Sequence, residues 1–230
     1  MPIQNKKLLD LGCGNGDNSF YYSRRGWQVT GVDIDVSVAK ARYPKLNFLT
    51  MAAERLDFPD HSFDEVQSRD VLEHVDDLPL AIEEIYRVLK IGGRLVVSVP
   101  TAKSEKILQR LDYQNWLRTG HQRIFEAGEL KKILENRGLA VVAVKKKGFF
   151  LFLMLWLMFK KKEMINSQRG DFAPSRFYYL LQVINQFFDA NLTFQTRAKF
   201  IPVWLVTLPV GYLLDQIFPK TISLTAIKKF

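Results

Sequence analysis

Short apolar runs alternate with segments of helical spacing along residues 7–144 of this chain. The apolar runs predict strands near residues 7–11, 28–32, 46–50, 64–68, 93–99 and 139–144. Apolar residues that recur every three or four positions predict helices near residues 17–25, 37–42, 77–90 and 127–137. Strands that alternate with helices form a doubly wound parallel sheet, with the ligand site at the carboxyl ends of the strands. The pattern therefore predicts an α/β fold of this kind.

The first predicted strand runs directly into a loop with glycine at every second position, Gly12, Gly14 and Gly16. Glycine tolerates positive φ and has no Cβ, so such a loop lets the backbone approach a ligand closely. The second predicted strand ends in Asp33, 17 residues after Gly16. In a βαβ unit this carboxylate lies near the loop and can accept hydrogen bonds from both ribose hydroxyls. The loop lacks the Lys-Ser/Thr pair of a phosphate-binding loop. The sequence therefore predicts a nucleoside cofactor that is not bound through a diphosphate.

Five segments extend this pattern over about residues 7–140: LLDLGCGNG, VTGVDID, RLDFPDHSFDEV, VLEHVDD and RVLKIGGRLVVSVP. In this order they resemble the class I S-adenosylmethionine-dependent methyltransferases, in particular the type 11 group that acts on small molecules. The resemblance implies S-adenosyl-L-methionine as the cofactor and a mostly parallel, seven-stranded, Rossmann-like sheet. Residues 222–228 would form its last, antiparallel strand, and residues 148 to about 220 would be an insertion before that strand.

The resemblance also assigns cofactor-binding residues. It implies that the methionine part of the cofactor is surrounded by Asp10, Gly12, Gly14 and Gly16. Asp33 would bind the ribose, and Ile34 would pack on the adenine.

One position departs from the family pattern. Ala52 stands where such sequences often carry the aspartate that reaches the adenine amino group. The adenine would then be held by the backbone of Ala53 or Glu54 and by apolar stacking.

Methyl transfer in this family is an in-line attack of a nucleophile on the sulfonium methyl group. The donor is already activated, so the protein mainly positions the reactants, and a general base is optional. The candidate catalytic residues are Asp70, after the fourth strand, and His121, in a GHQRIF segment that resembles the family's H-x-x-x-F element. Alternatively, Asp70 caps a helix, although Asp77 fits that role better, and His121 bonds backbone at a helix entry. Three scattered histidines and one cysteine predict no metal site.

Charge divides the chain sharply. Residues 1–139 contain 20 basic and 20 acidic residues, whereas residues 140–230 contain 13 and 4, so the net charge of +9 lies entirely in the C-terminal part. There the run FFLFLMLWLMF, residues 149–159, lies between two Lys triplets. It is shorter than the roughly 20 residues that a spanning helix needs, but its flanking lysines could reach anionic headgroups. The sequence predicts a methyltransferase core at 1–147, a hydrophobic, basic, helical, membrane-associating insertion at 148–220, and the last core strand at 221–230.

The cysteine content and the basic residues indicate where in the cell the protein is located. Cys13 is the only cysteine, so no internal disulfide forms and a reducing cytosol is compatible. The chain enters a strand almost at once, and we expect no signal peptide. The C-terminal cations are mostly Lys and its aromatics lie in charge-free blocks, so nucleic acid is not an expected partner. These features predict a cytoplasmic protein bound peripherally to the inner face of the membrane.

Taken together, these features predict an S-adenosylmethionine-dependent methyltransferase that acts on a small, lipid-like acceptor at the membrane surface. Two alternatives stay open. One is a soluble small-molecule methyltransferase whose apolar insertion forms a homodimer interface. The other is a non-catalytic, methyltransferase-like binding domain, to which Ala52 lends support. The sequence does not distinguish O-, N- and C-methylation.

Overall fold

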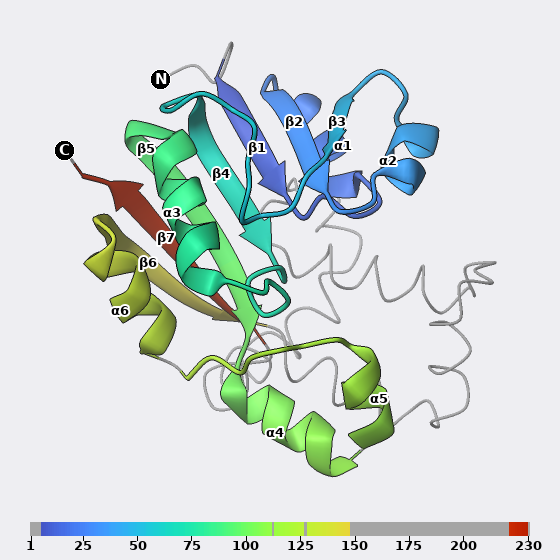
Figure 1. Cartoon of the computed structure of the whole chain (residues 1–230), viewed down its shortest axis with the longest axis vertical. Helices are drawn as coiled ribbons and strands as arrows, with labels where there is room; N and C mark the ends of the chain where they lie inside the picture. The colour runs from blue at the N-terminus through green and yellow to red at the C-terminus, as the bar shows by residue number, and fades with distance from the viewer. Residues whose placement is uncertain (1–5, 112, 127, 148–220, 230) are drawn as a thin grey trace, which may run out of the picture. The chain divides into compact units, whose positions relative to one another are not determined.

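A computed structural model describes residues 6–111, 113–126, 128–147 and 221–229 (Figure 1). The strands are β1 (Lys7–Leu11), β2 (Gln28–Asp33), β3 (Asn47–Thr50), β4 (Phe63–Arg69), β5 (Leu89–Pro100), β6 (Leu139–Lys147) and β7 (Thr221–Lys228). The helices are α1 (Asp17–Ser23), α2 (Ser37–Arg42), α3 (Leu78–Val88), α4 (Ala102–Leu111), α5 (Tyr113–Arg118) and α6 (Glu129–Asn136). Every strand and helix predicted within residues 7–144 and 222–228 is present. Helices α4 and α5 were not predicted.

The strands form a seven-stranded sheet in the order β3-β2-β1-β4-β5-β7-β6. β1 to β5 pair in parallel, whereas β7 is antiparallel to both of its neighbours, β5 and β6. This confirms the predicted doubly wound sheet with its antiparallel last strand. The strand order reverses between β1 and β4, and ligands of such sheets bind at this reversal, outside the carboxyl ends of the strands.

Helix α3 anchors the core against the sheet (Figure 1). Its apolar side chains Leu78, Ala81, Ile82, Ile85 and Val88 are buried, which is the spacing of one helix face. Asp77 caps this helix, since its carboxylate accepts a hydrogen bond from the Leu80 N–H at 3.0 Å. The preference for Asp77 over Asp70 as the cap is therefore confirmed.

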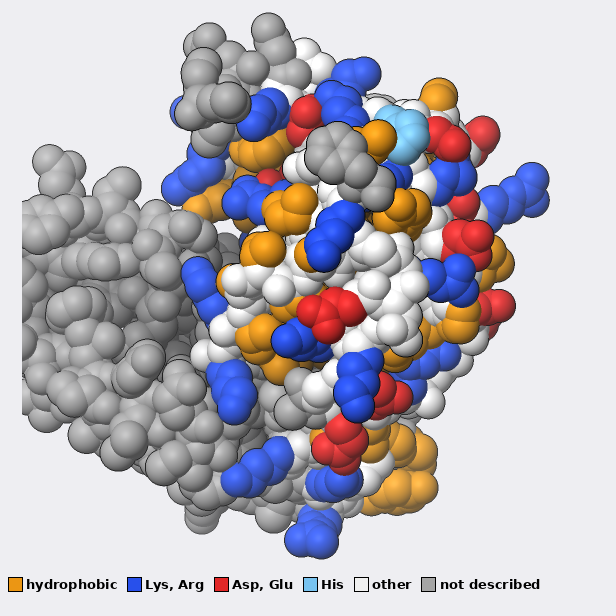
Figure 2. Space-filling view, turned by 90° about the vertical axis from the view of Figure 1, so that its left-hand side faces the viewer, with side chains coloured by type: hydrophobic (Ala, Val, Ile, Leu, Met, Phe, Trp, Pro, Cys, Tyr) orange, Lys and Arg blue, Asp and Glu red, His pale blue; other side chains and the backbone are white. Residues whose placement is uncertain are grey.

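Figure 2 shows basic and acidic side chains interspersed over one face of the described residues, with hydrophobic side chains between them. This mixture agrees with the balanced charge of residues 1–139, which hold 20 basic and 20 acidic residues.

The predicted insertion and the three-part division of the chain lie largely outside the described residues, because residues 148–220 are not among them. Among the helices that are described, none has the length and apolar character needed to cross a bilayer.

Candidate active site

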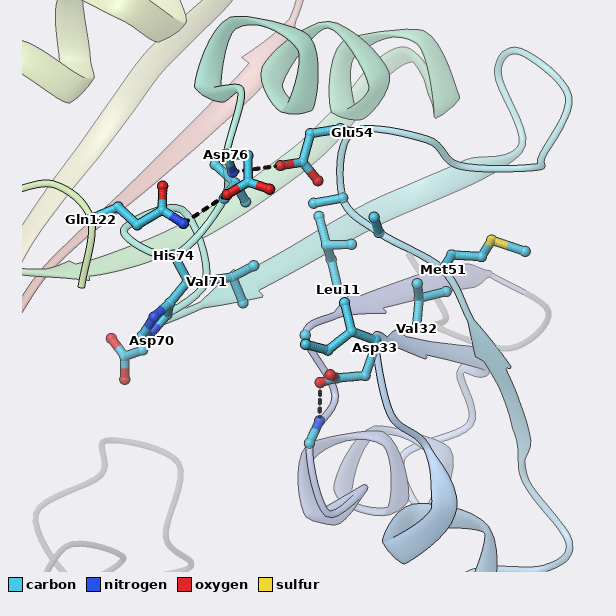
Figure 3. Close-up of a pocket in the computed structure, with 16 residues that line it drawn as sticks. Leu11, Val32, Asp33, Met51, Glu54, Asp70, Val71, His74, Asp76 and Gln122 are labelled. Atoms are coloured by element: carbon cyan, nitrogen blue, oxygen red, sulfur yellow. Dashed lines mark hydrogen bonds between the residues drawn. The ribbon is translucent and has the colours of Figure 1, made fainter. Parts of the chain in front are cut away.

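A cavity of about 600 Å³ lies at the carboxyl ends of β1, β2 and β4 (Figure 3). Four loops and one residue from a later segment supply its walls: Leu11, Gly12, Gly14, Val32, Asp33, Ile34, Met51, Ala52, Ala53, Glu54, Asp70, Val71, His74, Val75, Asp76 and Gln122. The cavity therefore occupies the position that the strand order predicts for a ligand.

The glycine loop forms one wall of the cavity and is fastened to β2. The N–H groups of Gly12 and Cys13 both donate to the Val32 carbonyl, at 2.8 and 3.0 Å. Gly12 has φ +73°, and a Cβ there would lie 2.1 Å from a methyl carbon of Val71. Gly14 has φ +50°, and a Cβ there would meet no atom within 4 Å. Gly12 is thus required for close packing, whereas Gly14 presents bare backbone to open space.

Asp33 lines the cavity next to the glycine loop, and its predicted binding of the ribose stays a prediction. Its Oδ2 accepts a hydrogen bond from the Gly14 N–H at 2.8 Å, which joins the end of β2 to the glycine loop. The next residue, Ile34, is 78% exposed although it is apolar, and it also lines the cavity. A carboxylate beside an exposed apolar side chain suits a ligand with a ribose attached to a flat base.

Asp10 and Gly16 lie behind the loop and outside the cavity lining. Asp10 is 2% exposed, and its Oδ2 accepts a hydrogen bond from the Ser19 hydroxyl at 2.6 Å. Burial raises the pKa of Asp10 above its usual range, although Ser19 and Arg69 oppose the shift. A Cβ at Gly16 would lie 2.8 Å from the Phe48 ring. These residues hold α1 and the loop together in the structure, and their direct contact with the cofactor stays a prediction.

We expect Ser19→Ala to lower the free energy of unfolding by about 1–3 kcal/mol, because it leaves the buried Asp10 carboxyl without its hydroxyl donor. Urea unfolding of the purified protein measures the change. Ser23→Ala on the same helix is the control, since the Ser23 hydroxyl bonds only the exposed Phe20 carbonyl, and we expect a change within about 0.5 kcal/mol. Equal losses in the two variants would contradict the role given to Ser19.

Met51, Ala52, Ala53 and Glu54 form the wall after β3. The Glu54 carboxylate contacts the loop before α3, because its Oε1 accepts the Asp76 N–H at 2.7 Å (Figure 3). The same oxygen accepts the Asp77 N–H at 3.3 Å. It thereby ties this wall to the loop that precedes α3. The predicted adenine contact with the backbone of Ala53 or Glu54 is compatible with this arrangement and stays a prediction.

Asp70 and His74 line the opposite end of the cavity, on the loop after β4 (Figure 3). Asp70 has φ +53°, a conformation that non-glycine residues rarely adopt, and its N–H donates to the Ser98 carbonyl at 2.9 Å. Aspartate and histidine adopt this conformation more often than other side chains, as His61 also does with φ +57°, and the catalytic role of Asp70 stays a prediction.

His121 lies outside the cavity lining, next to His74. The two rings meet edge to face with their centroids 4.8 Å apart. His121 Nδ1 lies 2.8 Å from Glu105 Oε2, and the Trp116 indole N–H donates to the same oxygen at 2.6 Å. The Glu105 carboxylate raises the pKa of His121. The His121 imidazole thus pairs with a carboxylate. The alternative for His121 was a hydrogen bond to backbone at a helix entry.

Glu73 is a buried carboxylate beside these histidines that the predicted site residues did not include. It is 1% exposed, and neither of its oxygens has a hydrogen-bond partner among the described residues. Burial raises the pKa of Glu73 to about 8. Candidate ligand atoms of Glu73, His74 and His121 lie within 4.8 Å of one another, a cluster that was not predicted from the sequence.

The cluster forms because two distant segments meet. The Gln122 N–H donates to the Glu73 carbonyl at 2.9 Å, and the Gln122 amide donates to Asp76 Oδ1 at 2.7 Å. The Arg123 guanidinium bonds the carbonyl groups of Leu72 and Val75. The adjacency of Glu73 and His74 in LEHV was the one local signal, but their approach to His121 depends on these long-range bonds.

A family model described as a methyltransferase domain matches residues 2–144. This chain belongs to the class I S-adenosylmethionine-dependent methyltransferases. The cofactor of that family is S-adenosyl-L-methionine. The cavity fits such a cofactor, since it offers the Asp33 carboxylate and bare backbone at Gly14.

The names of curated relatives of this chain differ in the atom that those proteins methylate. A ubiquinone biosynthesis O-methyltransferase of Idiomarina loihiensis is 32% identical over 167 residues, which cover 64% of this chain and 69% of that protein. A ubiquinone/menaquinone biosynthesis C-methyltransferase of Pectobacterium atrosepticum is 33% identical, covering 58% and 59%. Phosphoethanolamine N-methyltransferase 1 of Zea mays is 30% identical, covering 40% of this chain and only 20% of the maize protein.

Solved structures support the fold. An S-adenosylmethionine-dependent methyltransferase from Mesorhizobium loti has a TM-score of 0.63 at 18% identity, covering 99% of this chain and 93% of that one. The [4+2]-cyclase SpnF has a TM-score of 0.62 at 22% identity, covering 98% and 75%. Since a cyclase shares the fold, the architecture does not by itself identify the reaction of this methyltransferase-family chain.

Proposed function

We propose that this protein transfers the methyl group of S-adenosyl-L-methionine to a small, lipid-like acceptor at the cytoplasmic surface of a membrane. The observation that carries the proposal is the cavity of about 600 Å³ that has Asp33 at one end and Asp70 and His74 at the other. This volume suits the cofactor together with the reacting part of an acceptor.

The Asp33 end accommodates the nucleoside. The carboxylate that accepts the Gly14 N–H would also accept the ribose hydroxyls, and Ile34 would cover one face of the adenine. Gly12 and Gly14 would let the methionine end run along bare backbone. Bound in this way, the cofactor supplies an activated methyl group on a sulfonium.

The Asp70 end positions the acceptor. Asp70 and His74 offer a carboxylate and an imidazole to the nucleophilic atom, while Val71 and Val75 from the same loop supply apolar walls that exclude water. Holding the two reactants in line can lower the barrier by roughly 7–11 kcal/mol, so these residues act mainly by orientation.

The membrane part of the proposal rests on sequence and on an exposed strand. β6 leads into residues 148–220, and it exposes Val142 by 62% and Val144 by 47% next to Lys145 and Lys146. Residues 149–159 continue this mixture with an uncharged apolar run between Lys triplets. The quinone-pathway names of two relatives agree with a lipid-like acceptor.

The test is methyl transfer from labelled S-adenosylmethionine by the full chain. The acceptors are a polyprenylated catechol in anionic vesicles and phosphoethanolamine in solution, and we expect label in the vesicle lipid only. Label only in phosphoethanolamine would overturn the lipid-like acceptor.

Flotation with the same vesicles tests the location separately. The double variant Phe152→Glu with Trp156→Glu should release the protein from vesicles. A control pair with the same change of charge, Val38→Glu with Ile91→Glu, alters side chains that are 54% and 51% exposed and should leave flotation intact. Flotation of the first pair at the wild-type level would overturn the membrane contact.

A further inference from the structure

Glu73, His74 and His121 form a compact group at the acceptor end of the cavity. One candidate ligand atom from each lies within 4.8 Å of the other two, and His74 also lines the cavity. Carboxylate and imidazole together are a common ligand set for divalent transition metals.

In both histidines Nδ1 already has a hydrogen-bond partner, which leaves Nε2 as the available ligand atom. His121 Nδ1 lies 2.8 Å from Glu105 Oε2, and His74 Nδ1 lies 3.2 Å from the Gly120 carbonyl. A neutral imidazole that donates from Nδ1 carries its free lone pair on Nε2. Histidines that bind metals characteristically donate their other ring N–H to a carboxylate or a backbone carbonyl. Trp116 in turn fixes Glu105 through its indole N–H.

Glu73 supplies the anionic ligand that such a site requires. Its side chain is almost fully buried, and neither oxygen has a hydrogen-bond partner among the described residues. Asp70 and Glu105 are the acidic groups that face it, and no described lysine or arginine forms an ion pair with it. A buried carboxylate without a partner is costly, and a bound cation would offset that cost.

We propose that Glu73, His74 and His121 bind a divalent first-row transition cation such as Zn²⁺ or Mn²⁺. Two imidazole nitrogens favour these ions over Mg²⁺ and Ca²⁺, which prefer oxygen ligands. His74 places the ion next to the cavity, with coordination positions left for water or an acceptor oxygen. If the proposed function holds, the ion would lower the pKa of an acceptor hydroxyl and orient it toward the methyl group.

Metal binding by the full chain tests the proposal without any turnover. After treatment with a chelator, the protein is titrated with Zn²⁺ by calorimetry and with Co²⁺ by visible absorption. We expect one ion per chain, weaker binding of Mg²⁺, and a melting temperature that rises with Zn²⁺. The absence of saturable binding at one ion per chain would overturn the proposal.

Variants locate the site. Glu73→Gln and His121→Gln should weaken Co²⁺ binding more than tenfold and remove its absorption spectrum. Glu105→Gln, which leaves all three ligands in place, should weaken binding about 10- to 100-fold through His121. His61→Gln is the matched control, because the His61 ring contacts the Leu89 carbonyl and Lys228 instead. Wild-type affinity in both Glu73→Gln and His121→Gln would overturn the assignment.

Two further measurements distinguish loss of the metal site from misfolding and from failure of the proposed function. Circular dichroism of each variant shows whether it is folded, and Glu73→Gln keeps the size of the side chain. Asp33→Ala should lose S-adenosylmethionine binding but keep the metal, so failure of the proposed function and failure of the metal site give different results.

Discussion

We expect Asp33→Ala to weaken binding of S-adenosyl-L-methionine by about 100- to 20,000-fold. The Asp33 carboxylate lies in the cavity wall, and the ribose would place two hydroxyl donors on it. Hydrogen bonds to a charged group contribute about 1.5–3 kcal/mol each, and every 1.4 kcal/mol is about tenfold in affinity. Isothermal titration calorimetry on the two proteins measures the difference.

Asp35→Ala provides the matched control for Asp33→Ala. Asp35 is a carboxylate two residues further on, outside the cavity lining, where it accepts the Ser37 N–H at 2.8 Å. We expect its removal to leave cofactor affinity within about twofold. Similar losses in the two variants would show that the ribose lies elsewhere.

Gly12→Ala should lower the free energy of unfolding by about 2–5 kcal/mol. Its φ of +73° costs an alanine about 1–2 kcal/mol, and the new Cβ would lie 2.1 Å from a Val71 methyl carbon. Rotation of Val71 gives only partial relief, because the Val71 Cβ itself would lie 3.3 Å away. Overpacking of this kind adds about 1–3 kcal/mol.

Two comparisons separate these causes for Gly12. Gly92 has φ +74°, and a Cβ there would meet no atom within 4 Å, so Gly92→Ala should show the conformational cost alone. In a Val71→Ala background, Gly12→Ala should cost less than in the wild type, although more than Gly92→Ala, because the Cβ that alanine keeps at position 71 would still lie 3.3 Å away. Urea unfolding of the set provides the values. A cost for Gly12→Ala that does not change when Val71 is shortened would contradict the clash.

The order of strands and helices could be predicted because each has its own period of apolar residues. Helices α4 and α5 were not found in this way, since no helix was predicted between the strand near residues 93–99 and the helix near residues 127–137. A local signal was nevertheless present. Thr101 directly precedes α4, and its hydroxyl accepts the Ser104 N–H at 3.2 Å, as in an N-terminal helix cap.

The cofactor side of the site was also largely predictable, because Gly12, Gly14 and Asp33 follow directly from strand ends. Asp10, which was also predicted to contact the cofactor, does not line the cavity. Side chains alternate across a strand, and the Asp10 carboxylate accepts a hydrogen bond from Ser19 on α1 instead.

The acceptor side depends on contacts between distant segments. His74 and the Gly120 carbonyl are 46 residues apart, and His121 and Glu105 are 16 apart. Periodicity carries no information about such pairings, so the cluster around Glu73 became visible only in the folded chain.

Calorimetry of S-adenosyl-L-methionine binding to the purified full chain, with and without anionic vesicles, tests the central claim most directly. We predict one cofactor molecule per chain with a micromolar dissociation constant, although Ala52 replaces the aspartate common in the family. The absence of binding under both conditions would contradict a methyltransferase and favour a non-catalytic domain that keeps the fold.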